Sequence, residues 1–209
     1  MTRNFSIALL SFILLAFVGC ASQPKKPLFI EASNQLLSPP PSDKAQITFL
    51  EPINSIQGLI PVGIYEVNED ESHTLLAITG SRSKSSVVLN PGHHRLMANQ
   101  SGMIAHYLEA NVEAGKHYYV LVRFIYGQGF QLRPLRTSGT SDYSVLSKDF
   151  PSWVSSTRFV EKTKEGEEFF QKIDNAVTKS QVKGWNVWLK KTKEERAELT
   201  LGPKDTVTQ

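Results

Sequence analysis

The chain has 209 residues, of which 40% are hydrophobic and 21% are charged, a composition typical of one globular domain with short extensions. Lysine and arginine total 23 against 20 acidic residues, so the net charge is only +3. This balance disfavours nucleic acid as a partner, and the single cysteine excludes both an internal disulfide and a cysteine-based zinc site.

Residues 1–19 are typical of an export signal peptide. Arg3 precedes an apolar run at 5–18, which is shorter than the ~20 residues that a membrane-spanning helix needs. The run ends at 17–20, Phe-Val-Gly-Cys, which resembles the lipobox of bacterial lipoproteins with phenylalanine in place of the commoner leucine. That resemblance implies cleavage before Cys20 and lipid attachment to it. The alternative is an ordinary secretory signal whose apolar run happens to end in cysteine.

Residues 20–43 are predicted to be a lipidated, proline-rich tether. The segment is rich in Ser, Gln, Lys and Pro and includes three consecutive prolines at 39–41, which favour an extended polyproline conformation. Residues 28–30, Leu-Phe-Ile, interrupt it and are compatible with either a short edge strand or a mobile stretch. Ala21, rather than aspartate, follows the cysteine, and the resemblance to lipoproteins then implies the periplasmic face of the outer membrane.

Residues 44–137 are predicted to form a β-sandwich domain. Short runs rich in Val, Ile, Tyr and Phe are separated by turn residues, at a spacing typical of antiparallel sandwiches. We expect strands at 46–50, 60–67, 74–79, 86–89, 94–99, 104–112, 117–126 and 130–135. Pro134 places the last strand at a sheet edge, because proline cannot donate to a ladder.

The register of one hairpin can be predicted around a loop at 101–103. Leu96 then faces Leu108 on one side of the sheet, where both are expected in the core. On the other side Arg95 faces Glu109, and we expect an ion pair between them. His94 falls on the core side at the start of its strand, where we expect it to be hydrogen-bonded.

Two stretches within this region resemble a known family. Residues 89–96, Leu-Asn-Pro-Gly-His-His-Arg-Leu, and 112–119, Val-Glu-Ala-Gly-Lys-His-Tyr-Tyr, look like signatures of an uncharacterised bacterial lipoprotein family. That family has a small immunoglobulin-like, carboxypeptidase-regulatory-like β-sandwich. The resemblance covers about residues 45–136 and implies a mainly β fold, an antiparallel immunoglobulin-like β-sandwich, but no activity. The chain departs from the family at 66–72, which is longer and acidic where the family has a tight hairpin.

The C-terminal part is predicted to be helical. After an irregular connector at 138–161, apolar residues recur at the helical period through 162–201. Two amphipathic helices are expected, the first ending at Gly184 and the second before a short tail at 202–209. We expect them to form a hairpin on the sheet that contains the strand at 117–126, both of whose faces look buried. A groove-binding or membrane-surface role is the alternative.

Candidate catalytic and metal-binding residues are few. Ser81 and Lys84 match S-x-x-K, but they fall in a polar turn rather than at a helix start, which disfavours a penicillin-binding type of serine site. The carboxylates at 69–71 are predicted to be solvated. The histidines fall on different strands or faces, so we expect structural or surface roles and no shared metal. They are His73, His93, His94, His106 and His117.

We therefore expect no catalytic residue, metal site or cofactor, and a non-enzymatic, membrane-anchored envelope lipoprotein. It would act as a protein-interaction or structural module, with the membrane as one partner through Cys20 and an unidentified envelope protein as the other. A glycan- or peptidoglycan-binding module is the second hypothesis, and it needs an exposed aromatic face. An enzyme without a recognisable motif is the third.

Overall fold

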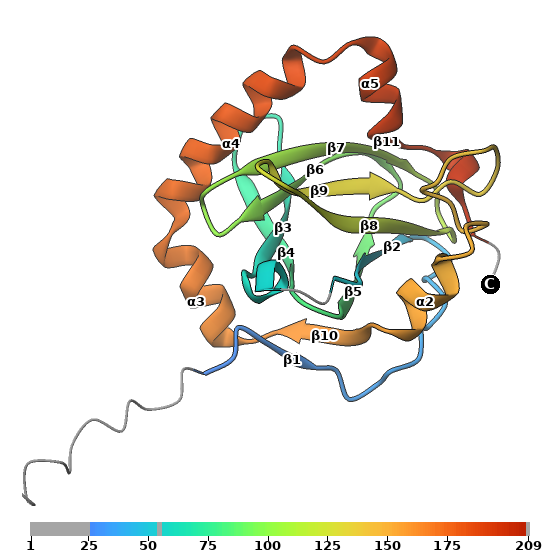
Figure 1. Ribbon diagram of the computed structural model, residues 1–209, viewed down its shortest axis with the longest axis horizontal. Coiled ribbons are helices and arrows are strands. Elements are labelled where there is room, and N and C mark those ends of the chain that lie inside the picture. Colours follow the sequence, from blue (N-terminus) through green and yellow to red (C-terminus); the bar gives the residue numbers. More distant parts are fainter. Residues whose placement is uncertain (1–25, 54–55, 208–209) are drawn as a thin grey trace, which may run out of the picture.

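The computed structural model describes residues 26–53 and 56–207 (Figure 1). The expected signal peptide and Cys20 lie outside the described residues. Within these ranges the chain is mainly β and forms two sheets that pack face to face, with helices on the outside.

The first sheet has six strands in the order β1-β10-β5-β2-β8-β9. Their bounds are Phe29–Glu31 for β1, Arg158–Lys162 for β10, Ser83–Leu89 for β5, Ala45–Glu51 for β2, His117–Ile125 for β8 and Gly129–Pro134 for β9. β9 is an edge strand, as Pro134 predicted. β10 runs parallel to β5 and β2 runs parallel to β8, while the other neighbours are antiparallel.

The second sheet has five strands in the order β11-β7-β6-β3-β4. Their bounds are Thr200–Leu201 for β11, Ala105–Val112 for β7, Gly92–Gln100 for β6, Val62–Val67 for β3 and His73–Thr79 for β4. All eight predicted strands are present, but the expectation of a purely antiparallel sandwich is wrong, because β11 also runs parallel to β7. A parallel pair needs a long crossover, and the chain between β2 and β8 supplies one by passing through the second sheet.

The core lies between the inner faces of the two sheets. Ile47 and Phe49 of β2 meet Leu96 of β6 and Leu108 of β7 there, and all four side chains are fully buried. Each such burial contributes roughly 1.5–3 kcal/mol. The predicted register is confirmed, since Leu96 is paired with Leu108, and Arg95, the residue before it on β6, is paired with Glu109.

Three helices, which we call the helical layer, cover the outer face of the five-stranded sheet. They are α3 (Lys164–Lys172), α4 (Asp174–Leu189) and α5 (Lys193–Glu198). Phe170, Val177 and Trp188 pack from this layer onto Met97 and Tyr107 of the sheet. The helices follow one another in an arc from β10 to β11, so the expected hairpin is wrong (Figure 1).

The expected helix end at Gly184 is also wrong, because α4 continues through this residue to Leu189. A Cβ at Gly184 would lie 2.5 Å from the carbonyl oxygen of Ala105 on β7. The missing side chain therefore lets the helix lie directly on the strand, which is a different use of glycine from helix termination.

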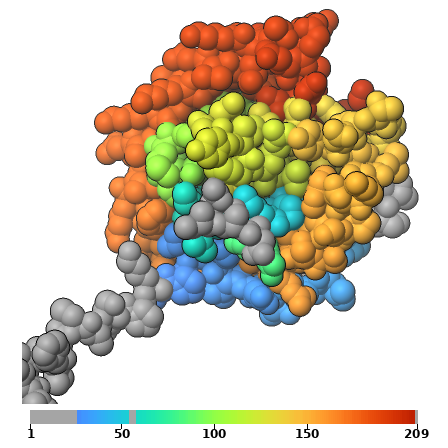
Figure 2. All heavy atoms as spheres, viewed as in Figure 1, coloured from blue at the N-terminus to red at the C-terminus, as the bar shows by residue number. Residues whose placement is uncertain are grey.

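The segment 138–161, expected to be irregular, contains α2 (Phe150–Ser155) and β10. Its residues 143–157, which we call the connector layer, cover the outer face of the six-stranded sheet over β8. Phe150 and Trp153 pack there against Leu50 and Leu121. The burial of both faces of β8 was expected, but the covering segment is the connector layer and not the C-terminal helices. Figure 2 shows the two layers on separate parts of the surface.

Residues 29–35, within the expected tether, are attached to the domain. β1 pairs with β10, so residues 29–31 form an edge strand and the folded part begins inside the expected tether. The Gln35 side chain extends this attachment, since its amide donates to the Phe159 carbonyl oxygen at 3.0 Å and its oxygen accepts from the Phe159 N–H.

Short 3-10 turns occur at Ile56–Leu59 (η2) and Pro203–Asp205 (η3), the latter inside the expected tail.

Candidate functional site

A small pocket lies where the helical layer meets the turn between β3 and β4. Its volume is about 140 Å³. This is below the ~300 Å³ at which pockets for whole small-molecule ligands begin, so the pocket fits a single side chain or functional group. It is lined by Val67, Glu71, Arg95, Tyr107, Gln181, Val182, Trp185 and Asn186.

Arg95 is the charged centre of this pocket. β6 places it on the outer face of the sheet, where its guanidinium carbon lies 4.0 Å from the ring centroid of Trp185 on α4. The Trp185 ring in turn meets Tyr107 edge-on at 5.1 Å and stacks on Trp188 at 6.4 Å. A cation over an indole face is attracted by the ring quadrupole, so the aromatic residues fix the guanidinium in place.

The Arg95 guanidinium has no polar partner within the described parts of the chain. It donates no hydrogen bond, its Nε is buried without an acceptor, and no carboxylate forms an ion pair with it. The two Nη atoms are not fully buried, and neither donates a hydrogen bond to another described residue. The predicted ion pair with Glu109 is therefore wrong, although the register is right, because Arg95 turns toward Trp185 instead.

The opposite wall of the pocket is a strained turn. Glu71 has a φ of 66°, a left-handed conformation that side chains other than glycine rarely adopt. Its carbonyl oxygen accepts a hydrogen bond of 2.8 Å from Nε2 of Gln181, which holds the turn against α4. Gln181 is only 4% exposed, and its own Oε1 has no partner among the described residues.

Tyr107 closes the floor of the pocket as a neutral phenol. Burial raises its pKa to about 12, against a lowering by the charge of Arg95 and with a further rise from Glu71. Its hydroxyl donates to the carbonyl oxygen of Gln181 at 3.3 Å. The lining contains no serine, cysteine, histidine or lysine, so this arrangement supplies binding groups and lacks the usual nucleophiles.

A wider cleft of about 290 Å³ lies between β4, β10, α3 and the start of α4. Its charged side chains are already paired: Nε2 of His73 lies 2.9 Å from Asp174, and Nζ of Lys162 lies 2.8 Å from Glu167. Tyr65 packs edge-on against His73 at 5.1 Å. These pairs leave the cleft with less capacity to hold a ligand than the Arg95 pocket has.

The other histidines each have a separate environment. His94 is 9% exposed, with Nδ1 2.6 Å from Glu66 and Nε2 2.8 Å from the Asn90 carbonyl oxygen, which confirms the expected hydrogen-bonded core position. His106 bonds the backbone of the β8–β9 turn, and His117 bonds Thr48 at 2.9 Å. Among residues 26–53 and 56–207, no group of three or more His, Cys, Asp or Glu side chains is placed to hold a metal ion.

The S-x-x-K residues are not brought together. The Ser81 hydroxyl donates to the Ile53 carbonyl oxygen at 2.9 Å, and Nζ of Lys84 donates to the Val154 carbonyl oxygen at 2.9 Å. Burial lowers the pKa of Lys84. Both side chains therefore donate hydrogen bonds to backbone carbonyl groups, and these carbonyl groups belong to different segments.

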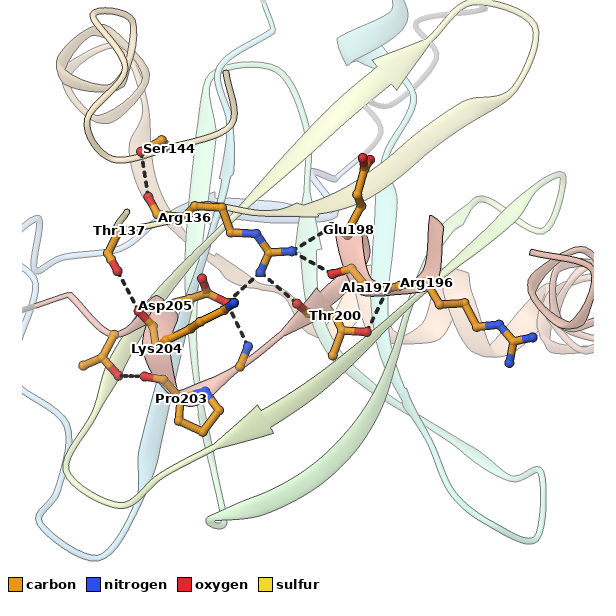
Figure 3. Close-up of polar contacts among 12 residues, drawn as sticks. Arg136, Thr137, Ser144, Arg196, Ala197, Glu198, Thr200, Pro203, Lys204 and Asp205 are labelled. Atoms are coloured by element: carbon orange, nitrogen blue, oxygen red, sulfur yellow. Dashed lines mark hydrogen bonds and ion pairs between the residues drawn. The ribbon is translucent and has the colours of Figure 1, made fainter. Parts of the chain in front are cut away.

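A polar cluster surrounds Arg136, just after β9 (Figure 3). Its guanidinium donates to Asp205, which is 2% exposed, at 2.7 Å, and to the carbonyl oxygens of Ala197 and Thr200 at 2.8 and 2.9 Å. Its own carbonyl oxygen accepts from the Ser144 hydroxyl at 2.8 Å. This cluster is saturated by the protein itself, so we interpret it as a structural clasp between the connector layer and the C-terminal segment.

Sequence reasoning missed the Arg95 pocket because its parts are far apart in the chain. Arg95 and Trp185 belong to a strand and a helix separated by ninety positions, and their contact depends on which sheet face the helix covers. The one available signal was the outward position of Arg95 next to aromatic residues on the neighbouring strand.

Comparison with known proteins adds no family. The chain matches no protein-family model and has no significant match among curated protein sequences. None of the helices in the described part of the chain is both long and apolar enough to cross a membrane.

Proposed function

We propose that this chain is a lipid-anchored protein of the bacterial envelope whose folded part binds another envelope protein and catalyses no reaction. The anchor is supported by the lipobox-like sequence before Cys20. Lys26 follows six residues later and contacts Glu165 of α3. Six residues span at most ~20 Å, so the anchor would hold the domain close to the bilayer. We also propose that the β-sandwich is of the immunoglobulin-like class and that the chain belongs to the uncharacterised lipoprotein family that it resembles.

The observation that supports binding is the open guanidinium of Arg95. Its two Nη groups have no acceptor in the described parts of the protein, so a partner that supplies a carboxylate would form charge-assisted hydrogen bonds with them in place of water. Arg136 provides the contrast, because the protein itself supplies acceptors for the guanidinium of that arginine.

A glycan-binding module has weaker support. The large exposed aromatic side chain in the described ranges is Tyr126, 91% exposed at the tip of the β8–β9 hairpin. A single ring is a poor platform for a sugar chain, and Arg95 and Trp188 stack against the Trp185 ring. Retention of the protein on purified cell-wall sacculi, lost on Tyr126→Ser, would favour this alternative.

The binding proposal is tested by photo-crosslinking in intact cells. A photoreactive amino acid at Asn186, which is exposed at the pocket rim, should yield an adduct with an envelope protein. The matched control is Lys148, exposed on the connector layer, where no such adduct is expected. Arg95→Met should abolish the adduct at 186. An adduct of equal yield from both positions, or none from 186, would refute the proposal.

The anchor is tested by Cys20→Ala. The wild-type protein should fractionate with membranes, and the variant should appear in the soluble envelope fraction or as an uncleaved precursor. Unchanged membrane association of a processed variant would show that Cys20 carries no anchor.

A further inference from the structure

We infer that the Arg95 pocket binds a carboxylate of a peptide chain, either an acidic side chain or a free chain end. This inference rests on the proposed function and names the group that the site recognises. Three features support it: the donors that are available, the size and walls of the pocket, and the charges around it.

The available donors are the two Nη groups of Arg95. They form the end of a planar fork whose geometry matches the two oxygens of a carboxylate. The Nε of the same side chain is buried, so a ligand approaches the guanidinium end-on. Stacking on Trp185 fixes the plane of the fork, and a rigid donor pair loses less conformational entropy on binding than a mobile one does.

The size and walls of the pocket suit one side chain. Its volume of about 140 Å³ accommodates a carboxyl group on a short aliphatic stem. Val67, Tyr107 and Val182 offer apolar or aromatic contact for such a stem. Val182 is 49% exposed and thus available to a partner chain.

The surrounding charges favour a singly charged ligand. Glu71 lines the pocket, and Glu109 lies across from Arg95 on β7, although neither forms an ion pair with it. Glu71 is exposed, so water and salt weaken its repulsion of an incoming anion. A doubly charged phosphate meets about twice the repulsion that a carboxylate meets at the same distance.

The experiment titrates the full mature chain in detergent with three peptides, each acetylated at its N-terminus, while the indole N–H resonance of Trp185 is followed by NMR. The first peptide has a free carboxylate at its end and no acidic side chain. The second has an amidated end and one internal glutamate, and the third has glutamine in its place. We expect the first or the second peptide, or both, to shift the resonance, and the third to leave it unmoved. The pattern tells a chain end from an acidic side chain.

Variants assign the effect to the pocket. Arg95→Met should weaken binding at least about tenfold, the loss expected for a hydrogen bond to a charged group, and Arg95→Lys should weaken it less. Glu71→Gln should strengthen binding about two- to threefold at low salt, and the gain should fade at high salt. The matched control is Arg133→Met, because Arg133 also lies over an aromatic ring but pairs with Glu198 at 2.8 Å. It should leave binding unchanged, and thermal unfolding of each variant verifies its fold.

Four results would overturn the inference. Equal binding of the glutamine peptide would show that the pocket recognises a neutral amide, and equal competition by inorganic phosphate would show a general anion site. Binding that survives Arg95→Met would place the site elsewhere. If no peptide binds but the crosslink at 186 still depends on Arg95, the carboxylate inference fails and the proposed function stands. If that crosslink is also absent, both fail.

Discussion

The helical layer and the connector layer both shield a sheet from solvent, but they are built differently. Each covers the outer face of one sheet, the first with three consecutive helices and the second with one short helix and a set of aromatic side chains. Both layers bring arginine onto aromatic rings. Arg95 of β6 lies over Trp185 of the helical layer, and its Nη atoms have no partner in the described protein. Arg123 of β8 and Arg133 of β9 both lie 4.8 Å from the ring centroid of Tyr143 in the connector layer.

The difference lies in what else these arginines contact. Arg123 donates to the Tyr143 hydroxyl, and Arg133 pairs with Glu198, so both guanidinium groups beside the connector layer have partners within the protein. Similar contacts between arginine and an aromatic ring thus have a structural role on one sheet and leave a binding group on the other. The satisfaction of hydrogen bonds, rather than the presence of an arginine or a tryptophan, distinguishes a candidate site from a packing contact.

The largest expected change in the free energy of unfolding comes from removing a tryptophan from the helical layer, and it should exceed the change from the matching substitution in the connector layer. Trp188 of the helical layer is 2% exposed, and Trp188→Ala should destabilise the protein by about 3–5 kcal/mol through lost burial and a cavity. Trp153 of the connector layer is half-buried, and Trp153→Ala should cost about half as much. Urea unfolding at neutral pH measures both, and equal losses would contradict this ranking of the two layers.

The clasp at Arg136 joins the two layers, and removing it should be the next most costly change. Arg136→Met leaves Asp205 buried without its cationic partner, so we expect a loss of about 3 kcal/mol in the free energy of unfolding. Arg95→Met, by contrast, removes a cation–π contact worth about 1 kcal/mol. Asp205→Asn in the Arg136→Met background should restore part of the stability, which a denaturant double-mutant cycle would detect. A clasp variant as stable as Arg95→Met would contradict the structural role.

The same contrast explains how far sequence reasoning reached. Alternation of apolar residues located all eight sandwich strands, and the β6–β7 register followed from two facing pairs. Helical periodicity located the C-terminal helices but not the sheet face that they cover, because an apolar stripe does not identify its partner. The connector layer was missed because its aromatic residues have no regular period. The Arg95 pocket was missed because it depends on where α4 lies.

The six-stranded sheet contains two buried ionisable groups that should make the stability of the protein depend on pH. Glu51 at the end of β2 is fully buried, and burial raises its pKa to about 8, with Thr79 opposing the shift only in part. The folded protein therefore holds a proton that the unfolded chain releases near its ordinary value of 4.5. Stability should be highest below pH 4.5 with respect to this group, and should fall as the pH rises toward 8.

Glu51→Gln should remove that fall. The glutamine keeps the shape without the ionisable proton, so the variant should exceed the wild type by roughly 1–3 kcal/mol at pH 8 and differ little at pH 4.5. Urea unfolding at a series of pH values measures the difference. The exposed Glu113→Gln serves as a control and should leave the profile unchanged. A parallel offset at every pH would show that Glu51 does not titrate as inferred.

The smallest expected effect lies on the outer face of the same sheet, at His117. This side chain is 2% exposed, and burial lowers its pKa from 6.5 to about 4. The unfolded chain then binds a proton that the folded protein resists, so stability should fall as the pH drops from 6.5 to 4. His117→Gln should flatten this part of the profile, whereas the exposed His93→Gln should not.

A substitution in the connector layer tests whether burial is the cause of the lowered pKa of His117. The His117 ring meets Tyr119 at 4.5 Å, and Tyr119 meets Phe150 of α2 at 5.3 Å, so the connector layer helps to keep water from the imidazole. Phe150→Ala should admit water and move the pKa of His117 upward toward 6.5, as NMR titration of its ring protons would show. Trp188→Ala, which loosens the helical layer on the other sheet, should leave that pKa unchanged. If the two variants moved it equally, the two layers would be coupled, and Arg136 would be the first residue to test, because it bonds Ala197 of the helical layer and Ser144 of the connector layer.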